Sequence, residues 1–299
     1  MSRPGRVVVV GDVVTDVVAV VARPLATGSD TPATIRVGGG GQAANTAAWL
    51  AEVGVPVTLV GAVGDDEAGR ARVVELTRAG VDCAVTAYPD RPTGSVVVLA
   101  SGEERTMLTE RGANERLTGA QVRQALAALP DARHLHLSAY PLLDAASRDA
   151  GLAALAAARA AGLTTSVDAA SAAPLRLVGA TAFLDWVRDV DLLLVNTDEA
   201  EALAGRTDST QQARALTATA RHVVVKCGSA GAVWAGPDGA VTTAPARPVT
   251  VVDVTGAGDA FAAGLLAGWL VGATPAVALA RAGELGARAV AGIGARPTR

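Results

Sequence analysis

Residues 253–261 read DVTGAGDAF and lead into a strongly apolar helical pattern. The two glycines of this loop let the backbone approach a ligand closely. At the N-terminus of the helix, the amides of Gly256–Gly258 would form an anion hole. Asp259 stands at the mouth of that hole, where a carboxylate can take a proton from a hydroxyl group. The loop therefore predicts a site that binds an anionic group and activates an alcohol.

In a structural alternative, the glycines only form a turn and Asp259 only caps the helix. A strand-like run, Val249–Val252, precedes the loop, and a second acid, Asp253, and a hydroxyl, Thr255, lie within it. A turn and a cap do not need these additional polar groups. The combination favours a functional site at the end of a strand.

Outward from this loop, short β-branched runs alternate with Ala-rich helical stretches along the chain. Strands are expected at Val7–Val10, Thr58–Val60, His134–Leu137, Thr164–Val167, Asp191–Val195 and His222–Val225. Helices are expected at Gln42–Val53, Asp66–Ala79, Gly119–Leu129, Ala145–Ala161 and Ser209–Thr219. This alternation predicts an α/β fold with a doubly wound, mainly parallel sheet and helices on both faces. Residues 1–299 are expected to form one such domain.

Two segments break the alternation, Val13–Val37 and Arg91–Thr109, because they carry strand-like runs and turns without a helix between them. In the second segment, Gly94–Ala100 and Thr106–Thr109 flank a plausible hairpin turn at residues 101–104. Together the two segments predict a small antiparallel sheet that protrudes from the main sheet.

Charge and composition narrow the classes of function. The net charge is −3 and the pI is near 5.7, which argues against nonspecific binding to nucleic acid or to a membrane surface. The longest apolar stretch, Ala260–Ala273, is interrupted by glycines and falls short of a membrane span. Cys83 and Cys227 are too few for a disulfide framework, and no secretory signal is visible. We therefore expect a cytoplasmic protein.

A second glycine-rich stretch, residues 38–47, reads GGGGQAANTA and precedes a helical pattern. Its glycines permit a ligand to lie against the backbone. A flexible loop is one alternative and a dinucleotide-binding fingerprint is another. That fingerprint should follow the first strand, which here ends in Gly11-Asp12 with no further glycine nearby. This speaks against a nicotinamide-dependent oxidoreductase.

Asn196 and Glu199 form an N-x-x-E pattern where a buried strand ends and a helix begins. Ligands collect at the carboxyl ends of parallel strands, and there this pair can order Mg²⁺ on ATP, largely through water. The structural alternative is a helix cap at Asn196 with acids in the first turn.

The stretch 226–231, KCGSAG, closes the next expected strand. Lys226 in this stretch could reach a phosphate. An exposed lysine at a strand end is the commoner case. The chain contains no G-x-x-x-x-G-K-[ST] sequence, so a P-loop is excluded as the phosphate cradle.

Taken in order, these motifs resemble those of the ribokinase/PfkB family of carbohydrate kinases. Residues 253–261 are similar to the family's D-T-x-G-A-G-D-x-F signature, and residues 38–47 to its GG-x-x-x-N-x-A signature. The N-x-x-E pattern and the 226–231 loop fall between them in the expected order. The resemblance spans Gly11 to Arg296 and implies a ribokinase-like fold whose lid, from segments 13–37 and 91–109, covers the sugar.

The resemblance implies an ATP-dependent kinase that phosphorylates a primary hydroxyl of a small sugar or sugar-like alcohol. Asp259 would be the base, and the amides of Gly256, Ala257 and Gly258 would stabilise the transferring γ-phosphoryl. Mg²⁺ would be ordered through Asn196 and Glu199. The implied acceptor-binding residues are Asp16, Gly40, Gly41, Asn45 and Asp259. The implied ATP-binding residues are Asn196, Lys226, Gly228, Gly231, Thr255, Gly256 and Gly258.

Two further expectations rest on the resemblance alone. A monovalent cation such as K⁺ would be held by Asp253, Thr255, Ala289, Gly292 and Gly294. The lids of two chains would clasp each other and form a homodimer.

The acceptor pocket departs from the ribokinase pattern, because Gln42 replaces a usual Lys, Val14 an Asn and Tyr140 an acid. These changes put ribose in doubt. They keep open a nucleoside (adenosine-type) or vitamin-precursor kinase on the same fold, and a non-catalytic sugar-binding regulator. We expect an unphosphorylated acceptor, because Asp16 would repel a phosphate. The basic candidates near the lid are expected to be solvated: Arg36, Arg105 and Arg111.

Overall fold

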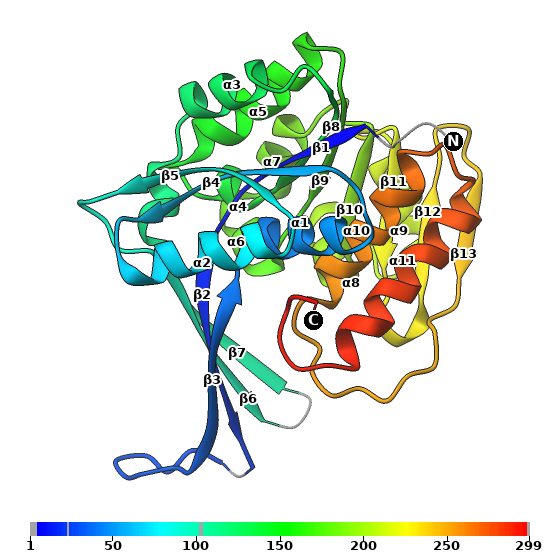
Figure 1. Cartoon of the computed structure of the whole chain (residues 1–299). Coiled ribbons are helices and arrows are strands. Elements are labelled where there is room, and N and C mark those ends of the chain that lie inside the picture. The colour runs from blue at the N-terminus through cyan, green and yellow to red at the C-terminus, as the bar shows by residue number, and fades with distance from the viewer. Residues whose placement is uncertain (1–4, 23, 102–103, 298–299) are drawn as a thin grey trace.

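The structure is a computed structural model that describes residues 5–22, 24–101 and 104–297. A nine-stranded sheet with the order β13-β12-β11-β10-β9-β8-β1-β4-β5 runs through the molecule (Figure 1). Its strands are parallel except at one edge, where β12 and β13 pair antiparallel. Their bounds are β1 Arg6–Val10, β4 Val57–Gly64, β5 Asp82–Tyr88, β8 Ala132–Ser138, β9 Thr164–Asp168, β10 Leu192–Asn196, β11 His222–Lys226, β12 Ala232–Ala235 and β13 Val241–Ala244.

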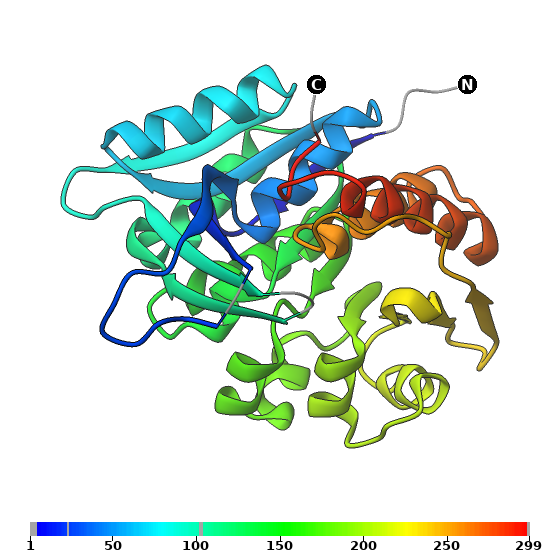
Figure 2. The same cartoon turned by 90° about the horizontal axis from the view of Figure 1, so that it is seen from below.

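Helices cover both faces of this sheet (Figures 1 and 2). One layer consists of α3 Gly119–Ala127, α4 Tyr140–Leu143, α5 Arg148–Ala160, α6 Ala172–Val178, α7 Ala180–Trp186, α8 Thr197–Ala204 and α9 Ser209–Leu216. The other consists of α1 Gln42–Glu52, α2 Glu67–Arg78, α10 Ala257–Trp269 and α11 Pro275–Val290. Successive side chains of a strand point to opposite faces. Val8 and Val10 therefore pack with the first layer, and Val7 and Val9 with the second.

This arrangement confirms the expected doubly wound α/β fold, and every expected helix and strand named above overlaps an observed element except one. Val249–Val252 is an irregular segment, so the expectation of a strand there is wrong. Pro245 and Pro248 lack amide donors for a ladder in this region. The amide of Val252 instead donates to the Val290 carbonyl at 2.7 Å. In the described part of the chain, no helix is long and apolar enough to cross a membrane.

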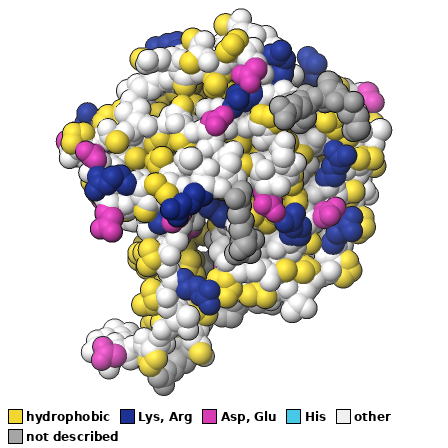
Figure 3. All heavy atoms as spheres, in the orientation of Figure 1, with side chains coloured by type: hydrophobic (Ala, Val, Ile, Leu, Met, Phe, Trp, Pro, Cys, Tyr) yellow, Lys and Arg dark blue, Asp and Glu magenta, His cyan; other side chains and the backbone are white. Residues whose placement is uncertain are grey.

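A separate four-stranded sheet protrudes from the main body (Figures 1 and 3). Its order is β3-β2-β6-β7, with bounds β2 Val14–Val21, β3 Ala33–Gly40, β6 Gly94–Ser101 and β7 Glu104–Glu110. The protruding sheet is built from the segments that predicted it, 13–37 and 91–109. It is mixed and not purely antiparallel, because β2 and β6 pair parallel. The expected hairpin turn at 101–104 includes residues 102 and 103, which lie outside the described residues.

The two faces of this second sheet differ in what they contact. On one face, Val98 and Met107 are directly paired and line the cavity described below. Side chains on the opposite face include Val37, Ile35 and Leu108, which are 67%, 63% and 58% exposed. The second sheet thus carries apolar side chains on both faces, and those of the outer face are uncovered in a single chain.

Candidate active site

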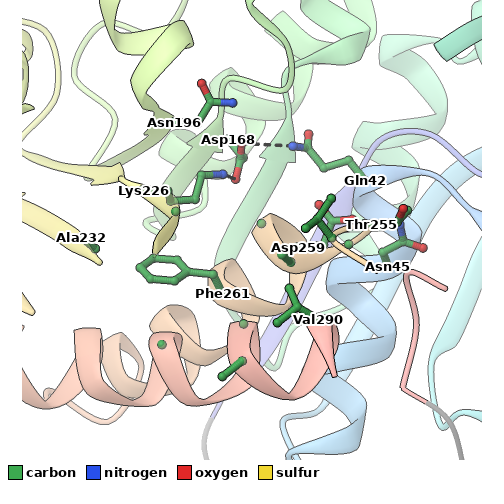
Figure 4. Close-up of a pocket in the computed structure, with 18 of the residues that line it drawn as sticks. Gln42, Asn45, Asp168, Asn196, Lys226, Ala232, Thr255, Asp259, Phe261 and Val290 are labelled. Carbon is green, nitrogen blue, oxygen red and sulfur yellow. Dashed lines mark hydrogen bonds and ion pairs between the residues drawn. The ribbon is translucent and has the colours of Figure 1, made fainter. Parts of the chain in front are cut away.

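A cavity of about 910 Å³ lies between the second sheet and the carboxyl ends of the central strands (Figure 4). The second sheet contributes Val14, Asp16, Val96, Val98, Met107 and Thr109 to its lining. From the main sheet, Asp168 closes β9, Asn196 closes β10 and Lys226 closes β11. Helix α10 begins at the same cavity, so residues from distant parts of the sequence meet there.

The first turn of α10 presents Asp259 to the cavity (Figure 4). The helix begins at Gly256, with φ of 76°, and no side chain caps it. A side chain at Gly256 would collide with the Ala295 backbone, which therefore requires glycine there. An uncapped helix N-terminus leaves amides available to an anion. The Ala257 amide donates to the Val254 carbonyl at 3.3 Å, and the anion hole at Gly256, Ala257 and Gly258 stays a prediction.

The carboxylate of Asp259 accepts a hydrogen bond at Oδ2 from Asn45 Nδ2, at 2.8 Å. Burial raises the pKa of Asp259 to about 7, although the Asn45 hydrogen bond lowers it, and the charge of Asp168 raises it further. A carboxylate with this pKa is a suitable general base near neutral pH.

Arg296, near the C-terminus, fixes the orientation of Asn45. Its Nε donates to Asn45 Oδ1 at 3.1 Å, and its Nη2 donates to the Gly40 carbonyl at 2.9 Å. Because the Asn45 oxygen accepts from Arg296, the amide nitrogen must face Asp259. The sequence motifs identified Asn45 but not Arg296, since nothing local to residue 296 indicates a partner 251 positions away.

Lys226 lies on the opposite side of the α10 terminus and forms an ion pair with Asp168. The Lys226 Nζ donates to Asp168 Oδ2 at 2.6 Å, and Gln42 Nε2 donates to Asp168 Oδ1 at 3.0 Å (Figure 4). Lys226 is 13% exposed and Asp168 1% exposed, so the expectation of an exposed lysine at a strand end does not apply. Sequence reasoning missed Asp168; its one local signal is an acid at the carboxyl end of a buried strand.

Asn196 and Glu199 form a complete capping box at the start of α8. Asn196 Oδ1 accepts from the Glu199 amide at 2.8 Å. Glu199 accepts from the Asn196 amide at 2.8 Å and from Asn196 Nδ2 at 2.7 Å. The structural alternative raised by the sequence is therefore realised. The same side chains line the cavity, and burial raises the pKa of Glu199 to about 7 although the charge of Lys226 lowers it.

The Asp16 carboxylate lies directly against Gly40, where a side chain would overlap it. Burial raises the pKa of Asp16 to about 6, against the lowering effects of Arg296 and Arg72. Gly41 has φ of 96° and abuts the Asp12 backbone, so the glycine-rich loop turns tightly beneath the cavity. The acceptor-binding residues expected from the sequence are thus brought together.

Asp253 connects two loops near the α10 terminus. Its Oδ1 accepts from the Thr255 amide and its Oδ2 from the Gly294 amide, each at 2.9 Å. Ala289 lies in the last turns of α11, and Gly292 follows that helix. The residues expected around a monovalent cation therefore converge on one region. Among the described residues, no group of three or more His, Cys, Asp or Glu is arranged to hold a metal directly.

Gly228 and Gly231, which were predicted to contact the nucleotide, line the cavity; Gly228 begins a short 3₁₀ turn after β11 and Gly231 follows that turn. Both have positive φ, of 55° and 96°. At the acceptor end, Tyr140 and Val14 also line the cavity, as the departures from the ribokinase pattern suggested.

The basic candidates near the lid differ from one another. The expectation that Arg111 is solvated is wrong, because its Nη2 donates to the buried Asp12 at 2.7 Å and its Nη1 to the Tyr140 carbonyl at 2.7 Å. Arg111 is therefore committed to holding the end of β1. Arg36 is exposed, as expected. Arg105 lies in β7, and its side chain is outside what the structure describes.

Comparison with known proteins agrees with this geometry. A family model for pfkB family carbohydrate kinases matches residues 5–299. An ATP-dependent ribose-1-phosphate kinase from Halopiger xanaduensis is 33% identical, over 97% of this chain and 94% of its own length. A fructoselysine 6-kinase from Escherichia coli is 30% identical, over 84% of this chain and 89% of its own length.

Solved structures show the same fold. An adenosine kinase from Sinorhizobium meliloti has a TM-score of 0.88 at 23% identity, with 98% of this chain and 96% of that chain covered. A ribokinase from Arabidopsis thaliana, complexed with ribose and ATP, has a TM-score of 0.80 at 25% identity, with 98% and 95% covered. The expected ribokinase-like fold is therefore confirmed.

We predict that Asp259 titrates near pH 7 and that Asn45→Ala moves its pKa upward, because the lost hydrogen bond stabilises the carboxylate. Carbon-13 NMR of carboxyl-labelled aspartates measures this, with the Asp259 signal assigned by its loss in Asp259→Asn. Gln211→Ala, which removes an exposed amide, should leave the signal unchanged. An Asp259 pKa near 4, or one insensitive to Asn45→Ala, would contradict the arrangement.

Proposed function

The chain belongs to the pfkB family of carbohydrate kinases, and we propose that it transfers the γ-phosphoryl of ATP to a primary hydroxyl of a small sugar or sugar-like alcohol. The observation that carries this proposal is Asp259, a carboxylate with a pKa raised to about 7 at the uncapped N-terminus of α10. A base and an anion hole within one helical turn are the two elements that in-line phosphoryl transfer requires.

In the proposed reaction, Asp259 takes the proton of the acceptor hydroxyl as that oxygen attacks the γ-phosphorus of ATP. The bond from this phosphorus to the bridging oxygen of the β-phosphate breaks, and ADP leaves. The amides of Gly256–Gly258 stabilise the charge that develops on the transferring group. Asn45 holds one carboxylate oxygen of Asp259, so the base keeps a fixed orientation toward the acceptor. Gly228 and Gly231 offer backbone to the nucleotide, and Asp16 accepts hydrogen bonds from acceptor hydroxyls.

Mg²⁺ fits this site through the buried carboxylate of Glu199, which lines the cavity beside Asn196. When bound with ATP, it would neutralise charge on the phosphates. Because both Glu199 oxygens already accept from Asn196, contact through water suits this pair better than direct ligation. A monovalent cation near Asp253 remains a proposal from the family resemblance.

A non-catalytic regulator is the rival from another class. A regulator does not require a buried base with a neutral-range pKa, so the state of Asp259 favours the enzyme. A reduced, cytoplasmic location suits the free, half-buried thiols of Cys83 and Cys227.

The acceptor itself has two candidates. A free sugar or nucleoside is favoured by Asp16 and by the commitment of Arg111 to Asp12. A sugar phosphate is favoured by the similarity to the ribose-1-phosphate kinase, and Arg36 is an exposed cation of the second sheet that could meet a phosphate. Arg36 pairs with Val18, and Val18 pairs with the cavity-lining Val98, so Arg36 belongs to the face of the second sheet that lines the cavity.

We predict that Asp259→Asn lowers kcat at least ~10²-fold without changing the unfolding midpoint, because asparagine keeps the size but cannot accept the proton. Activity is measured as ADP release over pentoses, hexoses, their phosphates and nucleosides. Wild-type kcat/KM should fall as the pH drops through about 7, where Asp259 becomes protonated. Asp185→Asn on the exposed end of α7 serves as control. Near-normal turnover of Asp259→Asn would exclude it as the base.

Glu199→Gln should raise the Mg²⁺ concentration that gives half-maximal rate, while the acceptor KM stays nearly unchanged. Glutamine can still complete the capping box, so α8 should remain stable. The measurement is a magnesium titration of the rate beside a thermal melt. A lower melting temperature with unaltered Mg²⁺ dependence would mean that Glu199 is only a cap.

Matched pairs of a free sugar and its monophosphate decide the acceptor class through their kcat/KM values. We expect the free member to be preferred, since Asp16 and a second phosphate repel each other. A preference for the phosphate that disappears in Arg36→Ala would reverse this assignment. Arg70→Ala, which removes an exposed arginine from α2, is the matched control.

The exposed outer face of the second sheet supports a homodimer formed through the lids, since a large uncovered apolar face is unfavourable in water. Ile35→Glu combined with Leu108→Glu should convert this dimer to a monomer. Sedimentation at micromolar concentration measures the change, with Leu177→Glu, on an exposed residue of α6, as control. A wild-type monomer under these conditions would remove the dimer.

A further inference from the structure

Of the 26 basic residues in the sequence, a single one is lysine, Lys226, and all the others are arginine. That lysine is 13% exposed and lines the active-site cavity (Figure 4). Burying an ammonium group costs free energy unless it is paired. A chain that otherwise uses arginine thus carries its only ammonium side chain at the site where phosphoryl transfer is proposed.

The Lys226 ammonium lies beside the anion hole. Its Nζ is 3.4 Å from the position that a Cβ atom would take at Gly258. One of its N–H groups donates to Asp168 Oδ2 at 2.6 Å, and an ammonium group has three donors in all. Burial lowers the pKa of Lys226, but the charges of Asp168 and Glu199 outweigh burial and hold it above its ordinary value. The side chain is therefore a fixed positive charge next to the Gly258 backbone.

Gln42 is the neutral residue that contacts the same carboxylate as Lys226. It stands in the glycine-rich loop where ribokinase-like sequences usually have lysine, and its Nε2 shares the Asp168 carboxylate with Lys226. The hydroxyl of Ser138 donates to Gln42 Oε1 at 2.5 Å, which orients the amide toward Asp168. A neutral amide satisfies the second carboxylate oxygen without competing for its charge.

We propose that Lys226 supplies from β11 the phosphate-binding positive charge that the glycine-rich loop lacks at Gln42. Asp168 and Gln42 are the positioning residues that hold its ammonium group beside the amides of Gly256–Gly258. This inference rests on the proposed phosphoryl transfer from ATP. It assigns the binding of the transferring phosphate to Lys226 and a role to Asp168, which no sequence motif indicated.

The small size of an ammonium group suits this location better than a guanidinium. Arginine presents a planar fork, whereas lysine is a compact point charge that can donate to Asp168 and to a phosphate oxygen at once. Lys226→Arg should therefore bind ATP more weakly than the wild type although its charge is unchanged.

The single lysine makes a direct binding test possible. Protein labelled with ¹⁵N only in lysine should give one side-chain ammonium signal, from Lys226. A non-hydrolysable ATP analogue with Mg²⁺ should shift that signal, and acceptor sugars alone should not. Asp168→Asn should move the signal in the free protein, as a positioning role requires. An ammonium signal unaffected by the nucleotide analogue would overturn the proposal.

Moving the positive charge from position 226 to position 42 tests the proposal through the affinity for ATP. Lys226→Met should weaken ATP affinity, measured by calorimetry, roughly 10- to 100-fold, the range of one charge-assisted hydrogen bond. Gln42→Lys in the Lys226→Met background returns an ammonium to Asp168 and should recover at least ~10-fold of that loss. Arg221→Met, which removes an exposed charge at the start of the same strand, is the control.

Failure of the proposal and failure of the proposed function are distinguishable. If the wild type binds ATP but releases no ADP with any acceptor, the proposed function fails while the binding comparison still applies. Lys226→Met can destabilise the fold because it leaves Asp168 buried and unpaired, so Lys226→Met with Asp168→Asn is the second variant. Wild-type ATP affinity in both of these variants, or the absence of rescue by Gln42→Lys, would overturn the role of Lys226.

Discussion

The ion pair between Lys226 and Asp168 is the constraint on which the geometry of the cavity depends. Three carboxylates, those of Asp168, Glu199 and Asp259, act on one buried ammonium group. Buried charges interact strongly. Lys226 therefore lowers the pKa of both Glu199 and Asp259, while Asp168 raises both. Burial is the largest cause for both groups, and it raises the pKa of each to about 7.

The parallel sheet makes this ion pair possible. Strand β10 lies between β9 and β11, and its register pairs Leu194 with Asp168 and Asn196 with Lys226. The acid and the base thus flank the end of β10 and reach across it toward each other. Ligands of open parallel sheets bind at the carboxyl ends of the strands, and Asp168, Asn196 and Lys226 are the residues that close β9, β10 and β11. The fold provides the meeting point, and the residues at the strand ends determine its chemistry.

Local patterns in the sequence were sufficient to predict the fold and the candidate site residues that lie within a single loop. The alternation of Val-rich runs and Ala-rich stretches predicted the two helical layers, and the loop at 253–261 predicted an anion hole at α10. What the sequence lacked were partners joined over long distances. Asp168 meets Gln42 across 126 positions, and Asn45 meets Arg296 across 251. Neither spacing has a local signature, because only the completed sheet and the returning C-terminal segment bring these side chains together.

The two interpretations of the N-x-x-E pattern, a helix cap and a pair that orders Mg²⁺, are compatible. Asn196 caps α8 and Glu199 completes the capping box, as a purely structural account requires. The same bonds hold the Glu199 carboxylate 2% exposed at the cavity wall, where burial raises its pKa. A carboxylate fixed by two bonds from Asn196 loses little rotational freedom when water or a cation meets it. The cap is thus the means by which the Glu199 carboxylate is positioned. At α10 no side chain caps the helix N-terminus beside Asp259, and that is where we propose that backbone amides meet a phosphate.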